Sequence, residues 1–251
     1  MKKMFRMVAL VAIVSGLAFA GCDKDDNSNS NTGSGTVDST TQPTPPPTPE
    51  PEPEPETWVD LGLPSGLLWA SCNIGANTPA EYGDYYAWGE TETKSSYGYD
   101  TYVYCNGSSY NLTKYCNNSI YGDNGFIDDM TTLEAMDDVA TQELGNGARM
   151  PTNEDWREIV DNTTSSWTTM NGVYGRRLTS KTNGQSIFLP AAGNMAGSEL
   201  YYAGEDGFYW SSSLCADSPD KARYFHPYHE GQYMSDTYRA LGIPVRAVRQ
   251  N

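Results

Sequence analysis

Two histidines are the first residues to consider for chemistry, and both lie in the segment His226-Pro227-Tyr228-His229-Glu230. Histidines three residues apart on a helix can share a zinc ion, but Pro227 breaks that helical geometry. The order also differs from the metalloprotease pattern, in which a glutamate directly follows the first histidine. The sequence contains no nucleophile elbow, phosphate-binding loop or dinucleotide fingerprint. We therefore expect no metal site and no catalytic residues, and predict that the protein is not an enzyme.

The segment from Tyr224 to Tyr238 is the most informative for function, because aromatic and small polar residues alternate within it. Tyrosine offers a large contact area at a low entropy cost, and Ser, Asp and Asn add adaptable hydrogen bonds. Such a surface suits sugar rings or protein epitopes. The candidate ligand-binding residues are Tyr224, His226, Tyr228, His229, Tyr233 and Tyr238. The alternative, that these tyrosines only cover a sheet, stays open.

The cysteines carry a second possible chemistry. Besides Cys22 the sequence contains Cys72, Cys105, Cys116 and Cys215. Outside the cytoplasm an even number of cysteines suggests disulfides, and four cysteines allow three pairings. We favour a disulfide between Cys105 and Cys116, since it closes a polar loop with little core of its own. Metal binding by cysteine is disfavoured, because no Cys-x-x-Cys spacing occurs.

One oxygen-rich segment is a candidate for calcium. Asp123-Asn124-Gly125 is followed by Asp128-Asp129, and oxygen-rich turns of this kind can form calcium loops. An ordinary solvated turn is the favoured alternative. We therefore expect no cofactor, with calcium as the single candidate ion.

The charge balance excludes whole classes of partner. The chain has 251 residues with 16 basic and 32 acidic side chains, a formal net charge of −16. Phosphate contacts need Lys and Arg, so neither nucleic acid nor an anionic bilayer is an electrostatic partner. From Trp58 onward 12 basic residues stand against 24 acidic ones, so the globular part shares this imbalance.

The N-terminus predicts where the protein resides. Three basic residues precede an apolar run from Met7 to Ala20 that is too short to span a membrane comfortably and has no charged stop after it. The run ends in Ala20-Gly21-Cys22, which resembles the bacterial lipobox, where the signal is cleaved before a cysteine that is then lipidated. We predict a lipoprotein signal peptide over residues 1–21 and a lipid anchor on Cys22. Acyl chains hold a soluble domain at a membrane without a spanning helix.

Residues 22–57 are expected to form a disordered stalk. Asp23-Lys24-Asp25-Asp26 resembles the surface-export signal of Bacteroidetes lipoproteins, so we expect an outer-membrane lipoprotein that faces the extracellular side. The polar tract that follows cannot offset the entropy of ordering, and Pro43 to Glu56 is a Pro- and Glu-rich stretch that favours an extended polyproline helix. Ser39 lies in a short motif that resembles a Bacteroidetes O-glycosylation site, and its glycosylation stays open.

Residues 58–251 are predicted to fold as a single α+β domain. One helix is expected from about Asp137 to Leu144, with Asp137 as its cap, and a second begins at Thr152, whose capping box pairs it with Asp155. Residues 73–127 have the composition of loops. Strand-like apolar runs flanked by turn residues occur at Trp58 to Leu63, Leu67 to Cys72, Arg177 to Lys181, Ser186 to Leu189, Gly207 to Ser212, Ala222 to His226 and Ile243 to Val248. The fourth of these follows Asn183-Gly184, a strong hairpin signal.

Three stretches carry a family resemblance. They are Val59-Asp60-Leu61-Gly62-Leu63-Pro64-Ser65-Gly66-Leu67-Leu68-Trp69-Ala70 with Asn73-Ile74-Gly75-Ala76; Arg149-Met150-Pro151-Thr152 with Glu154 and Trp156; and Ser180 to Gly184 with Phe188 to Gly193, Tyr209 to Ser213 and Val245-Arg246. Together they resemble the Fibrobacter succinogenes major paralogous domain of Bacteroidetes lipoproteins over essentially all of residues 58–251. We interpret the motif tryptophans Trp69, Trp88, Trp156 and Trp210 as core residues, and Arg149 and Arg246 as buried ion-pair anchors.

The resemblance implies a C-type-lectin-like fold similar to that of the formylglycine-generating enzyme, with two helices, short antiparallel strands and long irregular loops. It also implies that segments before the last strand lie on a ligand-binding face. The enzyme works through cysteines near its C-terminus, and Cys215 has no downstream partner here. We expect a surface lipoprotein that presents a lectin-like binding or adhesion domain to glycan or protein ligands. The alternatives are an accessory subunit of a cell-surface complex and, less favoured, a sulfatase-modifying type of enzyme.

Overall fold

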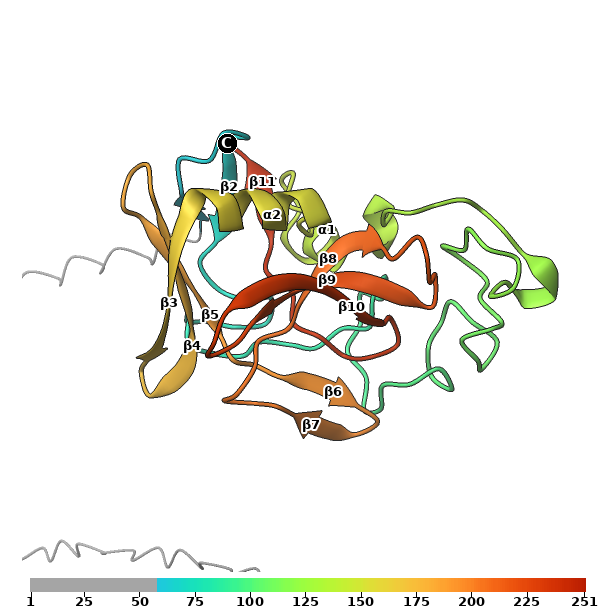
Figure 1. Ribbon diagram of the computed structural model, residues 1–251. Helices are drawn as coiled ribbons and strands as arrows, with labels where there is room; N and C mark the ends of the chain where they lie inside the picture. Colours follow the sequence, from blue (N-terminus) through green and yellow to red (C-terminus); the bar gives the residue numbers. More distant parts are fainter. Residues whose placement is uncertain (1–57) are drawn as a thin grey trace, which may run out of the picture. The chain divides into compact units, whose positions relative to one another are not determined.

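The computed structural model describes residues 58–251, which form an α+β domain (Figure 1). The fold class predicted from the sequence is confirmed, since short antiparallel strands in four separate sheets accompany two α-helices in this part of the chain. The predicted signal peptide, the lipidated Cys22 and the stalk lie outside the described residues. Within residues 58–251, no helix has the length and apolar character needed to cross a membrane.

The two ends of the domain meet in one sheet. Strand β2 (Leu67–Ala70) lies between β1 (Trp58–Asp60) and β11 (Val248–Gln250), and both pairings are antiparallel. A turn around Gly66, whose φ of +72° suits glycine, joins β1 to β2. The two strands predicted at these positions are confirmed, although both are shorter than expected.

The second helix, α2 (Asn153–Asn162), begins as its sequence predicts. The Thr152 hydroxyl accepts a hydrogen bond from the Asp155 amide at 3.1 Å, and the Asp155 carboxylate accepts one from the Thr152 amide at 2.7 Å. Trp156 and Ile159 are fully buried on one helix face. Local capping and helical periodicity are therefore sufficient to predict this element.

The first helix, α1 (Val139–Leu144), begins one residue later than predicted. Asp138 rather than Asp137 is its cap, and accepts a hydrogen bond from the Thr141 amide. Asp137 instead ends the 3-10 helix η2 (Ala135–Asp137), and its carboxylate accepts hydrogen bonds from Lys114 and other side chains. Asp137, which the local pattern predicts as the helix cap, thus makes long-range hydrogen bonds instead.

A three-stranded sheet follows α2 in the order β3 (Thr163–Met170), β4 (Val173–Ser180) and β5 (Ser186–Pro190). The predicted β4–β5 hairpin around Asn183-Gly184 is confirmed, and Gly184 has a φ of +76°. Strand β3 was not predicted, because its Thr- and Ser-rich sequence lacks the apolar alternation of a half-buried strand. Only its first residue is accordingly buried, and half of its residues are exposed.

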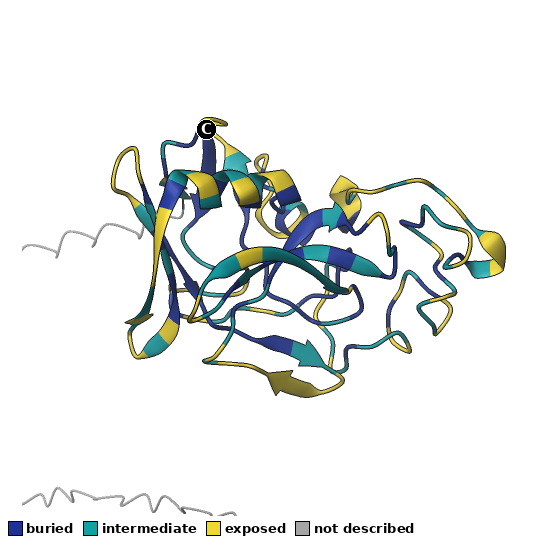
Figure 2. Ribbon diagram, viewed as in Figure 1, coloured by how far each residue is buried: buried dark blue, intermediate teal, exposed yellow. Residues whose placement is uncertain are grey.

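The remaining strands form two more sheets. Strand β9 (Lys221–Pro227) lies between β8 (Tyr209–Leu214) and β10 (Gln232–Tyr238), and a small hairpin pairs β6 (Asn194–Ala196) with β7 (Glu199–Tyr201). Strands β8 and β9 follow two predicted apolar runs, whereas β6, β7 and β10 were missed. Figure 2 shows that β7 is exposed along its length, while β8 is largely buried.

Tryptophans occupy the centre of the core, which confirms their predicted role. Trp69, Trp88, Trp156 and Trp210 are all fully buried. The Trp156 ring stacks on Phe225 of β9 at 4.7 Å, so α2 is fixed over this sheet. The Trp88 indole donates a hydrogen bond to the Ser211 carbonyl at 2.8 Å, which satisfies its polar atom inside the core.

The strand predicted over Ile243 to Val248 is wrong for most of its length. Only Val248 belongs to a strand, and Ile243 forms an isolated bridge with Tyr86. Pro244 has no amide hydrogen to donate to a sheet, and Arg246 turns its side chain into the core. The apolar run is therefore buried as an irregular segment.

The two predicted arginine anchors differ from each other. Arg149 forms an ion pair with Asp155 at 2.6 Å, but 37% of its side chain is exposed. Arg246 is fully buried, and its partners are neutral: the carbonyls of Ala70, Ser71 and Phe188, and the amide oxygen of Asn73. The predicted ion pair of Arg246 is thus replaced by neutral acceptors.

All four cysteines of the domain are free thiols in the structure. This differs from the disulfide that the sequence favoured between Cys105 and Cys116. The Cys105 thiol donates to the Tyr99 carbonyl at 3.1 Å, and the Cys116 thiol donates to the Asn118 carbonyl at 3.2 Å. Both residues belong to a small apolar cluster around Leu112, so the loop has a core without a covalent link.

Thiol accessibility tests this arrangement. In a fragment covering residues 51–251, a disulfide-exchange reagent is expected to modify Cys72, which is half-buried, and to spare Cys105, Cys116 and Cys215 until denaturation. Burial raises the pKa of the Cys105 and Cys116 thiols, which slows their reaction further. Denaturation without reductant should release all four thiols. Release of only two would show that a disulfide forms.

Candidate functional site

An Asn-Gly turn places two aromatic rings at one edge of the domain. Asn171 and Gly172 join β3 to β4 with φ angles of +51° and +82°, as a two-residue type I′ turn requires. Trp167 of β3 lies opposite Arg176 of β4, so Trp167 and Tyr174 project from the same face. Their rings are stacked, with centroids 6.5 Å apart and planes at 8°. The hairpin therefore presents a flat aromatic surface.

The loop between β7 and β8 adds a third ring and two carboxylates. Tyr202 has a φ of +59°, which is unusual for a residue with a bulky side chain. Its carbonyl accepts hydrogen bonds from the amides of Glu205 and Asp206, both at 3.0 Å. The Tyr202 ring packs on Phe208 at 6.0 Å. The loop is thus held in a conformation that turns Tyr202, Glu205 and Asp206 outward together.

The turn between β9 and β10 contributes the third side of the site. Tyr228 is bridged to Asp206, and its amide donates to the Gly231 carbonyl at 2.9 Å. The Tyr228 ring stacks on His226 at 5.3 Å, and Tyr233 contacts both rings edge-on. The ring of Tyr228 is therefore fixed from behind before any ligand is bound.

These three segments enclose a cavity of about 570 Å³, which we call the aromatic groove. Its lining residues are Trp167, Tyr174, Tyr202, Gly204, Glu205, Asp206, Tyr228 and His229. Four aromatic side chains, two acids and one histidine thus meet in one concave surface. Ligand sites in proteins have this character, with apolar surface for contact and a few polar groups for orientation.

His226 lies behind the groove as a neutral ring. Burial lowers its pKa, and the Asp206 carboxylate opposes this only in part. The His226 Nε2 atom is 3.5 Å from the Asp206 Oδ2 atom, too far for a strong hydrogen bond. The imidazole therefore serves mainly as a stacking surface between Phe208 and Tyr228.

The six residues predicted to bind a ligand do not form one surface. Tyr228 and His229 line the groove, whereas Tyr224 is buried and His226 and Tyr233 support Tyr228 from behind. Tyr238 pairs with Lys221 at the far end of the β9–β10 hairpin and contacts Tyr99 instead. Because side chains alternate along a strand, Tyr233 and Tyr238 also point to opposite faces.

The sequence interpretation missed the other groove residues. Trp167 and Tyr174 belong to a hairpin that was not predicted, and Tyr202, Glu205 and Asp206 lie in an irregular loop. One local signal was available, since Asn171-Gly172 stands between Trp167 and Tyr174. No local signal brings that hairpin next to Tyr228.

The candidate calcium segment lies away from the groove lining and uses its acids for loop structure. Asp128 accepts hydrogen bonds from the amides of Tyr115 and Cys116 at 2.7 and 2.8 Å, and Asp123 accepts one from the Asn106 side chain. Among the described residues, no three His, Cys, Asp or Glu side chains are grouped so that they could hold a metal ion.

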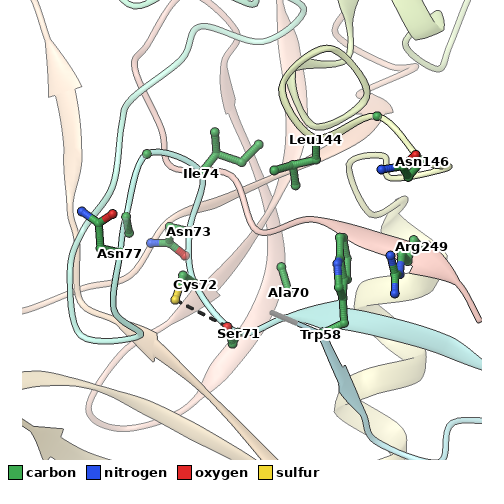
Figure 3. A pocket seen from close by; sticks show the side chains of 13 residues that line it. Trp58, Ala70, Ser71, Cys72, Asn73, Ile74, Asn77, Leu144, Asn146 and Arg249 are labelled. Atoms are coloured by element: carbon green, nitrogen blue, oxygen red, sulfur yellow. Dashed lines mark hydrogen bonds between the residues drawn. The ribbon is translucent and has the colours of Figure 1, made fainter. Parts of the chain in front are cut away.

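A second cavity, of about 410 Å³, lies beside β1 and β2 (Figure 3). Arg249 covers the Trp58 ring at 4.6 Å, and Asn73 accepts two hydrogen bonds from the buried Arg246. The Cys72 thiol contacts the Ser71 hydroxyl at 3.5 Å. Several of its polar side chains are thus engaged within the domain.

Comparison with known proteins found no protein family, no curated protein and no solved structure that matches this chain. What the groove binds has to be inferred from its own side chains.

Proposed function

We propose that this chain is a lipid-anchored surface protein whose C-type-lectin-like domain binds a carbohydrate chain in the aromatic groove. The observation that carries this proposal is the stacked pair of Trp167 and Tyr174, facing a cavity that is also lined by Tyr228 and two carboxylates. A sugar ring has an apolar C–H face and a rim of hydroxyls. The aromatic side chains can stack on the C–H face, and the carboxylates can accept hydrogen bonds from the hydroxyls.

The groove exposes aromatic rings and carboxylates to water. Tyr174 and Tyr202 are more than half exposed, so a sugar ring stacked on them removes apolar surface from water. The carboxylates of Glu205 and Asp206 can accept charge-assisted hydrogen bonds from hydroxyl groups. Because neighbouring rings and the loop hydrogen bonds already hold these side chains, little ordering entropy is lost on binding.

The rest of the chain supports a role outside the cell. A lipidated Cys22 and the stalk of residues 22–57 would hold the domain away from the outer membrane on its extracellular side. The groove would then bind glycans of the surroundings or of other cells, without chemistry and without a cofactor. Nucleic acid is disfavoured as a partner by the net charge of −16.

An accessory role in a cell-surface complex is the second candidate, favoured by one observation. Val103 and Met136 are 62% and 66% exposed and line the same shallow cavity beside Asp137. Exposed apolar side chains that lie together are typical of protein contacts. On this alternative, Val103→Asp would release a protein partner from the purified membrane complex while glycan binding stayed absent.

The glycan proposal is tested by removing one ring at a time. Trp167→Ala is expected to weaken binding to the glycans that the wild-type protein selects on an array by at least about 10-fold, since aromatic anchors dominate binding energies. Tyr228→Ala should act in the same direction. Isothermal titration with the selected glycan measures both effects.

Tyr238→Ala is the control, because Tyr238 is a half-exposed tyrosine at the far end of the β9–β10 hairpin. It should leave the affinity unchanged. All three variants should unfold at nearly the wild-type temperature, since none of the changed rings is fully buried. Wild-type protein that selects no glycan, or an equal loss in Tyr238→Ala, would contradict the proposal.

A further inference from the structure

Arg176 is a buried cation without a partner. Its residue is only 6% exposed, and its Nε and Nη1 atoms are sealed from solvent with no hydrogen-bond acceptor. Burial lowers the pKa of its guanidinium group, and among residues 58–251 Tyr228 is the ionisable group that opposes this shift, with no carboxylate doing so. A buried charge that is neither paired nor hydrogen-bonded is costly to a fold. The stability of the domain therefore does not explain why Arg176 is buried without a partner.

The other buried arginines show that this fold can satisfy a guanidinium group. Arg239 donates to the carbonyls of Tyr115 and Lys114 at 2.8 and 2.7 Å. Arg246 donates five hydrogen bonds to backbone and Asn73 oxygens. Arg176 alone among the nine-tenths buried arginines of the described chain donates none. The Nε atoms of Arg239 and Arg249 also lack an acceptor, so Arg176 is distinguished by the absence of any hydrogen bond from its guanidinium group and not by an unmet Nε alone.

That position adjoins the aromatic groove, and Arg176 is not itself one of the residues that line it. On the β3–β4 hairpin, Arg176 lies directly opposite Trp167. Tyr174 is two residues away on the same strand, so its side chain projects from the same face as that of Arg176. Tyr228 approaches from the β9–β10 turn. Arg176 thus shares a face of the β3–β4 hairpin with two of the rings that line the groove, and Tyr228 lies near it.

Only Nη2 of the guanidinium group is left to meet a ligand from the groove. It has no hydrogen bond, and unlike Nε and Nη1 it is not sealed from solvent. An anion at this point would accept a charge-assisted hydrogen bond in a largely desolvated place, where such bonds are strong. A neutral hydroxyl would offset less of the cost of the buried charge.

We propose that the aromatic groove selects an acidic sugar, whose carboxylate binds Arg176 while its ring stacks on Trp167. This inference rests on the proposed function of the groove in glycan binding. The carboxylate of a uronic or sialic acid can accept a charge-assisted hydrogen bond from the Nη2 atom of Arg176.

The charge distribution of the groove would orient such a ligand. Arg176 belongs to β4, whereas the acids Glu205 and Asp206 come from the β7–β8 loop. The carboxylate of a ligand is attracted to Arg176 and repelled by Glu205 and Asp206. The sugar's hydroxyls, in turn, can donate to the two acids. A neutral or basic glycan would leave Arg176 without its counter-ion.

The test uses the full chain on an array of matched glycans: oligogalacturonates and their methyl esters, sialylated glycans and their asialo forms, and sulfated glycans without carboxylates. The wild-type protein is expected to select the carboxylated members. Arg176→Met should weaken their binding by at least about 100-fold, as loss of a buried charge partner does. Arg177→Met is the matched control, since its side chain projects from the other face of β4 and contacts Ser186; it should bind as wild type.

Thermal unfolding without ligand separates a binding role from a structural one. Because Arg176 has no partner to lose, Arg176→Met is expected to unfold at the wild-type temperature or above it. A clear fall in unfolding temperature would overturn the inference. So would selection of neutral or only sulfated members with an affinity that Arg176→Met leaves unchanged; if Trp167→Ala still abolished that binding, the groove would remain a glycan site. If no member bound, both proposals would fall.

Discussion

Replacing Arg246 by methionine is expected to lower the free energy of unfolding by about 3–5 kcal/mol, because several buried acceptors lose their donor at about 1–3 kcal/mol each. The guanidinium group donates to the Ala70 and Ser71 carbonyls at 3.0 Å and to the Phe188 carbonyl at 3.0 Å. It also donates twice to the Asn73 amide oxygen. Methionine fills similar space but leaves all of these buried acceptors without a donor.

The effect is large because Arg246 joins separate parts of the fold. Ala70 ends β2, Phe188 belongs to β5, and Arg246 itself lies in the irregular segment before β11. Urea denaturation at pH 7 measures the loss. Arg149→Met, which removes a partly exposed ion pair with Asp155, is the control and should cost about 1 kcal/mol or less. A loss of similar size in both variants would contradict this role of Arg246.

The second large effect is expected at Asp137. Its carboxylate accepts hydrogen bonds from Lys114 at 2.6 Å, from the Tyr104 hydroxyl at 2.6 Å, and from the Tyr115 hydroxyl. Asp137→Asn should lower the free energy of unfolding by about 2–4 kcal/mol at pH 7, because it removes the counter-charge of Lys114 and turns a donor toward other donors. Glu134→Gln is the matched control. Glu134 contacts the same Lys114 at 2.7 Å but is half exposed, so it should contribute about 1 kcal/mol or less.

The pH dependence gives an independent check of this network. Burial by itself raises the pKa of Asp137, but the hydrogen bonds from Lys114, Tyr104 and Tyr115 outweigh it, so the pKa lies below its ordinary value of 3.8. A carboxylate with a lowered folded-state pKa stabilises the fold above its unfolded pKa, and this contribution is lost as the pH falls through the folded value. The wild-type protein should therefore lose stability below pH 3.8 more steeply than Asp137→Asn. Parallel pH profiles for the two proteins would contradict the assignment.

Elements with strong local signals were predictable. The capping box of Thr152 and Asp155 and the apolar positions Trp156 and Ile159 define α2 within one short window. The β4–β5 hairpin follows from Asn183-Gly184 in the same way, because a turn that needs a positive φ restricts the residues that can form it. In these cases the interactions that form the element lie within a few residues of each other.

Elements whose stability comes from elsewhere in the chain were missed or misplaced. Strand β3 has little apolar pattern of its own and is held by pairing with β4 along its whole length. The apolar run from Ile243 to Val248 satisfies a strand pattern, yet the core holds it in an irregular path around Arg246. Burial among distant residues overrides local propensity at both places.

The residues of the aromatic groove were likewise predictable only in part. Composition alone pointed to the segment around Tyr228 as a binding surface, and Tyr228 and His229 do line the cavity. Trp167, Tyr202 and Asp206 come from two other segments, and the burial of Arg176 without an acceptor for Nε or Nη1 is a property of the folded chain alone. Charge balance, capping and turn chemistry can be read along the chain, since they act between neighbours or as a sum. A concave site needs residues that are far apart in sequence, and only the packing of the β3–β4 hairpin, the β7–β8 loop and the β9–β10 turn against one another brings them within reach of a single ligand.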